Sequence, residues 1–442
     1  MELGTTGRGP ATDRGDGAGR GFDRPLLWAT LLAFGVRALW LLRPSTDTGD
    51  STEYGRLAFW LVTRHIFSED GRAASSYRPP LYPAVIAAGD LLTHHPIAAV
   101  LVLQVMVGTI TVALTYCIAR ALFGKTTAWL SGFLLALAPM TSRFSTVLLT
   151  ETIFTCLVVL GMWTWIRSKT VVSGVALGLA TLTRAFSLPY LIALLAYGVA
   201  GPRGASRKSA LTVAIVGLLT VAPWALRNME QVRRLTVADA GWGLNLFYGT
   251  IDLHRGSNRW SQLVAAHARL DGATSAPRSE PQAAAPSYAG EQRAREVAVS
   301  WIRQHPVAWV GIRARQWPWL VLDTGDYLPV AANRTSFSGA LAARQVSTIA
   351  LKTLFIGGNA LLLLLAAYGA MSLRGRLQET IPLWTFPVYV MTAHLPVYVE
   401  PRYGLPLVPF LVVLAAEGVR RLGVAIVSPG LIPDREWHGP TL

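Results

Sequence analysis

Apolar and polar residues alternate in long blocks along this chain of 442 residues. There are about ten apolar segments, most of them near the ~20 residues that a membrane-spanning helix needs. The segments run roughly 25–43, 97–122, 127–143, 146–166, 171–184, 187–200, 209–225, 347–373, 380–396 and 403–420. The pattern predicts an all-α polytopic membrane protein of about ten transmembrane helices, and it does not settle how 171–225 divides into helices.

Basic residues in the short polar loops orient these predicted helices. They fall on one side of the membrane if the spans alternate, and the basic N-terminal tail falls on the same side. The residues are Arg120, Lys125, Arg167, Lys169, Arg203, Arg207, Lys208, Arg374, Arg376, Arg420 and Arg421. Because Lys and Arg are enriched in cytoplasmic loops, this side is predicted to be the cytoplasm of an inner or plasma membrane. Two long loops, about 44–96 and 226–346, then face outward.

The same pattern predicts one transmembrane domain between two tails. Residues 1–24 are polar and rich in Gly, and they predict a disordered cytoplasmic tail. The apolar run that follows lacks a small-residue cleavage site, so a retained first span is expected rather than a cleaved signal peptide. Residues 25–421 form the predicted transmembrane domain, and 422–442 form a second cytoplasmic tail.

The second outer loop combines a flexible stretch with helical patterning. Residues 272–290 are rich in Pro, Ser and Ala and predict flexibility. After this stretch, apolar residues recur at helical spacing on both sides of Pro306, and arginines take the opposite positions. Two amphipathic helices are therefore predicted. They either lie on the membrane face or pack as a soluble hairpin on the loop itself.

Composition excludes several classes of function. The formal net charge is +15, but the arginines form no stripe with interleaved aromatic residues, so nucleic-acid binding is not expected. Both cysteines lie inside apolar blocks and give no disulfide framework. The chain has no HExxH, CxxC, P-loop or GxSxG pattern. No metal site is predicted.

Charged residues within or beside apolar segments are costly, and each needs an explanation. Asp50 and Glu53 follow the first segment, Arg78 precedes "PPLYP", and Glu151 opens the fourth segment within "LTETIF". Asp50 is either a helix N-cap or an acid of a site. Arg78 is either a snorkelling arginine or a clamp for a phosphate. Glu151 lies at membrane depth near a helix N-terminus, which favours its charge.

Three more arginines complete a predicted ring of cations at the outer mouth of the bundle. Arg184 lies near the outer end of the fifth segment and is expected either to neutralise Glu151 or to bind an anion. Arg227 and Arg402 follow or precede other segments on the same side. Acids and arginines are thus predicted to converge where a lipid phosphate would lie.

Seven stretches that contain these residues resemble motifs of a known family. They are "GDSTEYGRLA", "RPPLYP", "LTETIF", "GLATLTRAFSLP", "APWALRN", "AREVAVSWIRQHPVAW" and "EPRYGLPLVPFLVVL". In this order they resemble the GT-C glycosyltransferases, in particular the branch with protein O-mannosyltransferases and lipid A aminoarabinose transferases. The resemblance covers roughly 26–420. It implies transfer of a sugar, with inversion, from a polyprenyl-phosphate donor to an acceptor hydroxyl outside the membrane. The acceptor is a lipid, a protein or a cell-wall glycan.

The resemblance also implies roles for single residues. Asp50 resembles the catalytic aspartate of the first outer loop and is predicted to be the base, while Glu53 either orients it or faces solvent. Glu151 resembles the second acidic residue of the family. The remaining predicted residues are Arg78, Arg184, Arg227 and Arg402 for the donor phosphate, and Tyr54, Tyr82 and Tyr403 for the substrate. No metal ion is predicted to be obligatory, although relatives differ in using a divalent ion.

Two other functions fit a bundle with charges at one end. A flippase or transporter of lipid-linked glycans would require symmetric halves and broken helices near the midplane, which the sequence does not indicate. A polymerase or ligase of the O-antigen type shares the donor class, but the order of its motifs differs. A second "DTGD", at 323–326, lacks the helix that follows the first and is interpreted as coincidence.

Overall fold

The structure is a computed structural model that describes residues 23–43, 49–239, 241–252, 288–322, 337–378 and 380–427. These residues form helices and connecting turns without any strand, which confirms the all-α prediction for this part of the chain. The second "DTGD", nearly all of both predicted tails and positions 272–287 of the predicted flexible stretch lie outside the described residues.

The helices follow one another with short connections. In the first half they are α1 (Arg24–Trp40), α2 (Gly49–Arg64), α3 (Leu81–Thr93), α4 (Pro96–Phe123), α5 (Lys125–Leu137), α6 (Pro139–Phe144), α7 (Glu151–Ile166), α8 (Thr170–Thr183), the 3-10 helix η1 (Ala185–Ser187), α9 (Leu188–Ala200) and α10 (Ala205–Val232). In the second half they are α11 (Trp242–Tyr248), α13 (Tyr288–Gln304), α14 (Pro306–Gln316), α15 (Trp319–Leu322), α17 (Phe337–Ala342), α18 (Val346–Ala370), η3 (Met371–Leu373), α19 (Ile381–Ala393), η4 (Pro401–Leu407) and α20 (Val408–Val427).

Most of the predicted apolar segments coincide with helices. Segment 97–122 lies within α4, and segments 171–184 and 187–200 correspond to the separate helices α8 and α9. Segment 127–143 is divided, because α5 ends at Leu137 and α6 begins at Pro139. A proline has no backbone N–H to donate inside a helix but is well placed in a first turn, so a new helix starts there.

Within the described residues, three helical stretches are long and apolar enough to cross a membrane: α4, α10, and α18 together with η3. Five shorter apolar helical stretches accompany them, namely α3, α7, α8, η1 with α9, and α19. These lengths support a membrane protein of the helical type. The count of ten spans and the two outer loops stay predictions. The two predicted amphipathic helices exist as α13 and α14, which meet at Pro306.

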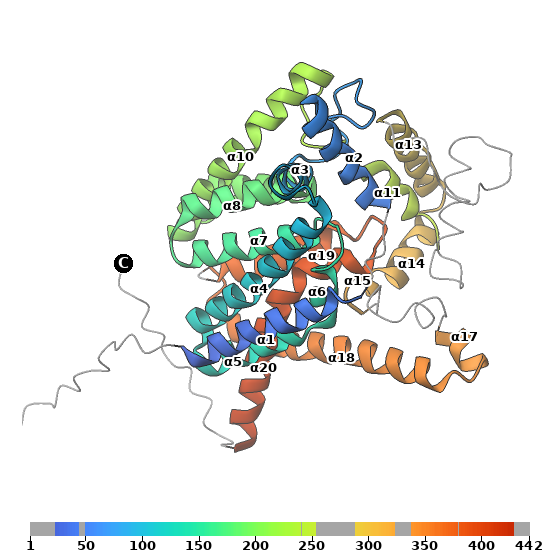
Figure 1. Ribbon diagram of the computed structural model, residues 1–442. Coiled ribbons are helices and arrows are strands. Elements are labelled where there is room, and N and C mark those ends of the chain that lie inside the picture. Colours follow the sequence, from blue (N-terminus) through green and yellow to red (C-terminus); the bar gives the residue numbers. More distant parts are fainter. Residues whose placement is uncertain are drawn as a thin grey trace, which may run out of the picture.

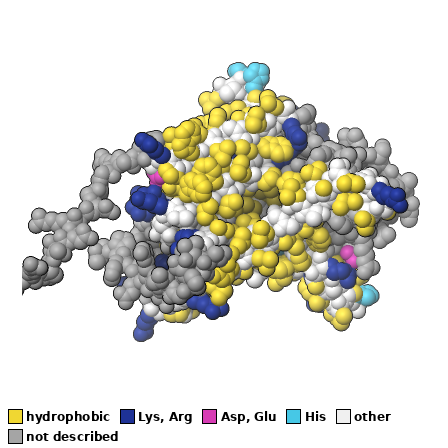
Figure 2. Space-filling model, turned by 90° about the horizontal axis from the view of Figure 1, so that it is seen from below, with side chains coloured by type: hydrophobic (Ala, Val, Ile, Leu, Met, Phe, Trp, Pro, Cys, Tyr) yellow, Lys and Arg dark blue, Asp and Glu magenta, His cyan; other side chains and the backbone are white. Residues whose placement is uncertain are grey.

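The helices pack side by side into one bundle. In Figure 1, α1, α4, α7 and α8 run in roughly the same direction, and α11, α13 and α14 gather beyond one end of them. Figure 2 shows a side of this bundle on which hydrophobic side chains cover most of the centre, whereas Lys and Arg lie mainly towards the margins. Many large apolar side chains are exposed, among them Leu354, Leu361 and Leu364 of α18. An apolar face of this extent fits contact with lipid.

Glycines let the last long helices approach closely. A Cβ atom built on Gly369 of α18 would lie 1.8 Å from the carbonyl oxygen of Leu414 in α20. A Cβ atom on Gly418 of α20 would lie 2.3 Å from the carbonyl oxygen of Leu365. A side chain at either position would have to displace backbone. Inside a membrane, burial of apolar surface does not drive the association of helices. Close packing at small residues contributes to it instead.

We expect Gly369→Ala to destabilise the protein, by about 1–3 kcal/mol, because the added methyl group forces α18 away from α20. Gly357→Ala on the same helix is the matched control, since nothing lies within 4 Å of its added Cβ. Alanine is the better helix former, so the control should be neutral or slightly stabilising. Thermal unfolding in detergent measures both variants. Equal midpoints would show that the close approach contributes nothing.

Candidate active site

The predicted acidic motif begins helix α2, which packs into an apolar cluster. Tyr54 and Ala58 of α2 contact a group of buried residues from α3, α4 and α7, together with Leu405 of η4. Ser51 adds a polar tie, because its hydroxyl donates to the carbonyl oxygen of Leu148 at 2.9 Å. The first turn of α2 is thus tied to the segment before α7, and its helix packs beside Leu405 of η4.

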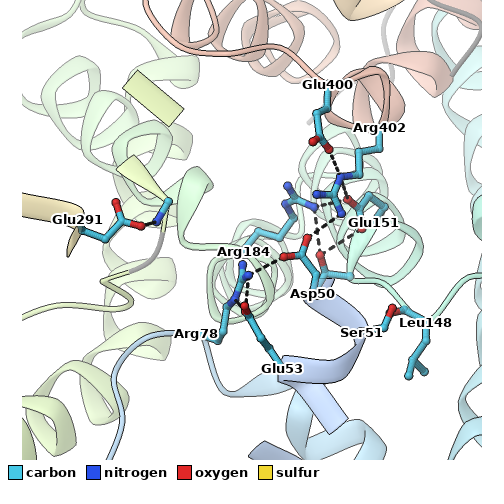
Figure 3. Close-up of polar contacts among 12 residues, drawn as sticks. Asp50, Ser51, Glu53, Arg78, Leu148, Glu151, Arg184, Glu291, Glu400 and Arg402 are labelled. Carbon is cyan, nitrogen blue, oxygen red and sulfur yellow. Dashed lines mark hydrogen bonds and ion pairs between the residues drawn. The ribbon is translucent and has the colours of Figure 1, made fainter. Parts of the chain in front are cut away.

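Asp50 lies between two arginines in the first turn of α2. Its Oδ1 is 2.6 Å from Nη2 of Arg78, and its Oδ2 is 2.7 Å from Nη1 of Arg402. Arg78 also donates from Nε and Nη2 to Oε2 of Glu53. Arg402 also pairs with Glu400. Figure 3 shows Asp50 at the centre of this arrangement. The carboxylate of Asp50 is therefore held by ion pairs on both sides.

Glu151 forms the second part of the same cluster. It is the first residue of α7 and is 2% exposed, and its Oε1 lies 2.6 Å from Nη1 of Arg184. The Nε of Arg402 is 3.8 Å from the same oxygen, so Arg402 joins the two parts. Arg184 also donates to the hydroxyl of Thr150. The start of α7 and the end of α8 thus meet α2 and η4 at one point.

The two acids of α2 have opposite electrostatic environments. Burial alone would raise the pKa of Asp50, but Arg402 and Arg78 together lower it well below its ordinary value. Burial also raises the pKa of Glu53, and there the single arginine Arg78 does not offset it. Asp50 is consequently ionised at neutral pH, whereas Glu53 is the more easily protonated of the two.

Acids outnumber arginines in this cluster. Its formal net charge is −1 with all groups ionised, and its members are Asp50, Glu53, Glu151, Glu400, Arg78, Arg184 and Arg402. Each of the three arginines already has at least one carboxylate partner. An anion that enters the site must share these guanidinium groups with the carboxylates. Because each guanidinium carries five N–H donors, such sharing is chemically feasible.

The three predicted tyrosines differ in position. Tyr54 lies beneath Arg78, whose guanidinium carbon is 5.3 Å from the ring centroid. The ring of Tyr403 lies 5.6 Å from the guanidinium carbon of Arg402. Tyr82 is fully buried and donates its hydroxyl to Oε1 of Gln104. Tyr54 and Tyr403 therefore border the cluster, while Tyr82 supports the packing between α3 and α4.

The structure places Arg227 apart from the other arginines. It lies in the last turns of α10, and its guanidinium donates to the carbonyl oxygens of Ser75 and Phe67. The guanidinium also lies over the ring of Trp224, at 4.7 Å from its centroid. These contacts fasten α10 to the segment between α2 and α3. The predicted ring of cations is thus formed by Arg78, Arg184 and Arg402 without Arg227.

Two polar residues near the site were not identified from the sequence. Gln104 of α4 is fully buried and donates to the carbonyl oxygen of Val147, which holds the segment before α7. Arg37 of α1 is 1% exposed. Both lie inside runs that read as apolar overall. A charged or polar residue within such an apolar run is itself a signal of function, and this signal would have identified both residues.

No group of three or more His, Cys, Asp or Glu side chains able to hold a metal ion occurs among the described residues. The carboxylates of the cluster alternate with arginines, which occupy the positions that a cation would otherwise take. That no metal is obligatory stays a prediction.

Removing the charge of Glu151 should destabilise the fold more than removing that of Asp50. Glu151→Gln deprives the half-buried Arg184 of its carboxylate partner; breaking a fully buried pair costs about 3–5 kcal/mol, and the partial exposure of Arg184 reduces this loss. After Asp50→Asn, Arg78 keeps Glu53 and Arg402 keeps Glu400, so the loss should be smaller. Thermal unfolding of the two variants in detergent compares them. A larger loss for Asp50→Asn would contradict this assignment of partners.

Sequence comparison places part of this site within a known family. Residues 77–226 match the family described as dolichyl-phosphate-mannose-protein mannosyltransferase. The match is about a third of the chain and includes Arg78, Glu151 and Arg184. No curated protein matches the chain.

Solved structures extend the likeness over most of the chain. An archaeal oligosaccharyltransferase, AglB from Archaeoglobus fulgidus, solved with an inhibitory peptide and a dolichol-phosphate, aligns with a TM-score of 0.51 and 14% identity. The alignment covers 91% of this chain and 50% of AglB, so the chain spans half the length of that protein. ArnT from Cupriavidus metallidurans aligns over 91% of this chain and 79% of its own, with 17% identity and a TM-score of 0.40. The resemblance drawn from the sequence motifs is thereby confirmed: this chain has a fold like that of GT-C membrane glycosyltransferases and matches one of their families over residues 77–226.

Proposed function

We propose that this protein transfers a sugar from a polyprenyl-phosphate donor to an acceptor hydroxyl in a single displacement with inversion. The observation that carries the proposal is the carboxylate of Asp50, held at 2.6–2.7 Å between Arg78 and Arg402 where α2, α7 and η4 meet. A base and several guanidinium groups within one cluster are what displacement of a phosphate from a sugar requires.

Arg78 and Arg402 are the proposed ligands of the donor phosphate. Guanidinium groups pair with phosphate oxygens through two parallel hydrogen bonds, and they stabilise the charge that develops on the leaving phosphate. The dolichol-phosphate bound in the AglB structure supports a carrier lipid of this kind. Arg184 is less available, because it is fixed to the buried Glu151 and to Thr150.

Asp50 is the proposed base that removes the proton of the acceptor hydroxyl. In the free protein the two arginines make it a weak base, since they stabilise its charged form. A donor phosphate that takes over some of their N–H donors would weaken this stabilisation and make Asp50 more basic. Donor binding would in this way prepare the base, and an acceptor that arrives first would meet an inactive site.

The remaining features of the proposal follow from topology and from the resemblance. The cluster lies at the end of the bundle that the distribution of basic loops assigns to the extracytoplasmic side. Helices α11, α13 and α14 lie near this end, in the predicted second outer loop, and are the proposed region of acceptor recognition (Figure 1). The sugar is a hexose or a pentose, and the acceptor is a lipid, a protein or a cell-wall glycan.

Asp50→Asn should reduce sugar transfer by roughly 10²-fold or more, because the variant lacks the base but keeps the shape of the site. Release of polyprenyl phosphate from a labelled donor measures the rate. Asp23→Asn is the matched control: it removes the same charge from an ion pair with Arg120 in the last turn of α4, outside the cluster and outside the proposed acceptor region, and should keep near-normal transfer. Near-normal turnover by Asp50→Asn would exclude Asp50 as the base.

The pH dependence of transfer should reveal Glu53. Its pKa is raised, so it gains a proton at a higher pH than an ordinary glutamate and then holds Arg78 less firmly. The wild-type rate should therefore fall as the pH is lowered through this raised pKa, while Asp50, whose pKa is lowered, stays ionised. Glu53→Gln should transfer more slowly at neutral pH and lose this acid limb. An unchanged acid limb in Glu53→Gln would assign the proton to another group.

A further inference from the structure

The backbone that carries Arg78 is not part of a helix. Residues 65–80, which connect α2 to α3, form neither helix nor strand, so no ladder of backbone hydrogen bonds fixes their course. The guanidinium of Arg78 nevertheless has a defined place between Asp50 and Glu53. A ligand of a reacting group must be held to within a fraction of an ångström if it is to act. Contacts from other parts of the chain therefore have to hold this connection.

Asp239 makes two of these contacts, and both go to Ser76. The backbone N–H of Asp239 donates to the carbonyl oxygen of Ser76 at 2.9 Å, and the hydroxyl of Ser76 donates to Oδ2 of Asp239. Ser76 is 2% exposed, and the side chain of Asp239 is 8% exposed. A hydrogen bond to a carboxylate is stronger than one between neutral groups. The chain is thus fastened two residues before Arg78.

Tyr77 lies between the fastened residue and Arg78 and packs against both neighbours of the site. Its ring centroid is 5.2 Å from the guanidinium carbon of Arg78, and the ring of Tyr54 is 5.3 Å from the same carbon. Tyr77 is 8% exposed, and its backbone N–H donates to the hydroxyl of Ser75 at 3.0 Å. Because Tyr77 follows Ser76 directly, a shift of Ser76 would move this ring and the guanidinium that packs on it.

The chain around Asp239 is itself anchored to two helices. The carboxylate of Glu291 in α13 accepts a hydrogen bond from the backbone N–H of Gly241 at 2.7 Å (Figure 3). On the other side, the indole N–H of Trp224 in α10 donates to the carbonyl oxygen of Val237 at 2.9 Å. Asp239 lies between these two contacts in the sequence. It therefore offers Ser76 a fixed partner.

Arg234 is the second partner of the Asp239 carboxylate. Its Nη1 lies 3.2 Å from Oδ2 of Asp239, and its guanidinium carbon lies 4.0 Å from the ring centroid of Tyr288 in α13. The carboxylate of Asp239 thus joins three parts of the chain. They are the connection before α3, the segment after α10 and, through Arg234, helix α13.

We infer that Asp239 is a positioning residue of the active site: through Ser76 it holds the segment that places Arg78 for the donor phosphate. Asp239 acts through Arg78 and does not itself contact the donor. The inference rests on the proposed function in taking Arg78 as a ligand of the phosphate of a polyprenyl-phosphate donor. Without the link, Arg78 would keep its carboxylate partners but would be less well placed to share its N–H donors with the phosphate.

Titration of the purified full-length protein in detergent tests this role. The probes are a polyprenyl phosphate and the matching polyprenol without phosphate. Ser76→Ala and Asp239→Ala should each weaken binding of the polyprenyl phosphate about tenfold, the loss expected for one hydrogen bond to a charged group, and should leave polyprenol binding unchanged. Equal weakening of both probes would give Asp239 a structural role only and would overturn the inference.

Ser68→Ala is the matched control for Ser76→Ala. Ser68 lies in the same connection and is fully buried, and its hydroxyl also donates to an aspartate, Asp70, at 3.0 Å. That contact stays within one turn and does not reach the segment after α10. The control should bind polyprenyl phosphate as the wild type does. Unchanged phosphate binding in both Ser76→Ala and Asp239→Ala would also overturn the inference.

A variant without Arg78 shows whether Asp239 acts through it. In an Arg78→Ala background, Asp239→Ala should cause no further loss of phosphate binding, because both substitutions then remove the same interaction. A further loss of about tenfold in that background would mean that Asp239 acts elsewhere, and the positioning role would be rejected.

Sugar transfer, measured in parallel, separates this inference from the proposed function. A wild type that transfers sugar, together with Ser76 and Asp239 variants that bind phosphate normally, would reject the positioning role and leave the function intact. A wild type that transfers no sugar but binds polyprenyl phosphate in dependence on Asp239 and Arg78 would reject the function and keep the role. A wild type that does not bind polyprenyl phosphate would reject both.

Discussion

The ion pairs of Asp50 with Arg78 and Arg402 join parts of the chain that are far apart in sequence. Asp50 belongs to α2, Arg78 to the turn before α3, and Arg402 to η4, more than 320 positions further on. Around this contact the apolar cluster of α2, α3, α4 and α7 closes against Leu405. The ion-paired side chains are only partly exposed, and Arg402 has three carboxylate partners, counting Glu151 and Glu400. The arrangement concentrates charge at one end of an otherwise apolar bundle.

This concentration of charge accounts for the chemistry that we propose and argues against transport. A carrier that moves a lipid-linked sugar across the bilayer needs its charges along a path near the midplane. Here the ion pairs gather at the ends of α2, α7 and α8, and the centre of the apolar face seen in Figure 2 carries few charges. A site at one membrane face suits a reaction in which the lipid phosphate stays at the interface and only the sugar is passed on.

Helix positions were predictable from the sequence because apolar length is a local property. Segment 97–122 matches α4 closely, and Glu151 begins α7 within the segment where it was expected. The break of 127–143 at Pro139 was missed, since the segment was assigned on its apolar length alone. The convergence of Asp50, Arg78 and Glu151 followed from topology, which puts the ends of alternate helices on the same side.

Side-chain direction could not be predicted in this way. Arg227 lies near the expected end of α10, but its side chain points to the segment between α2 and α3. The rotation of a helix about its axis decides which neighbours a side chain contacts, and the sequence position along the helix does not show this rotation. Tyr82 turns into the packing against Gln104 for the same reason. Arg37 escaped notice because one arginine scarcely changes the hydropathy of a 17-residue helix.

The central claim is that this cluster cleaves the bond between a sugar and a polyprenyl phosphate. A donor with one label on the sugar and another on the lipid tests it directly, in proteoliposomes that contain the purified protein and candidate acceptors. The claim predicts that the sugar label moves to the acceptor while the lipid label is recovered as polyprenyl phosphate. Both labels crossing the bilayer together, with the bond between them intact, would contradict it.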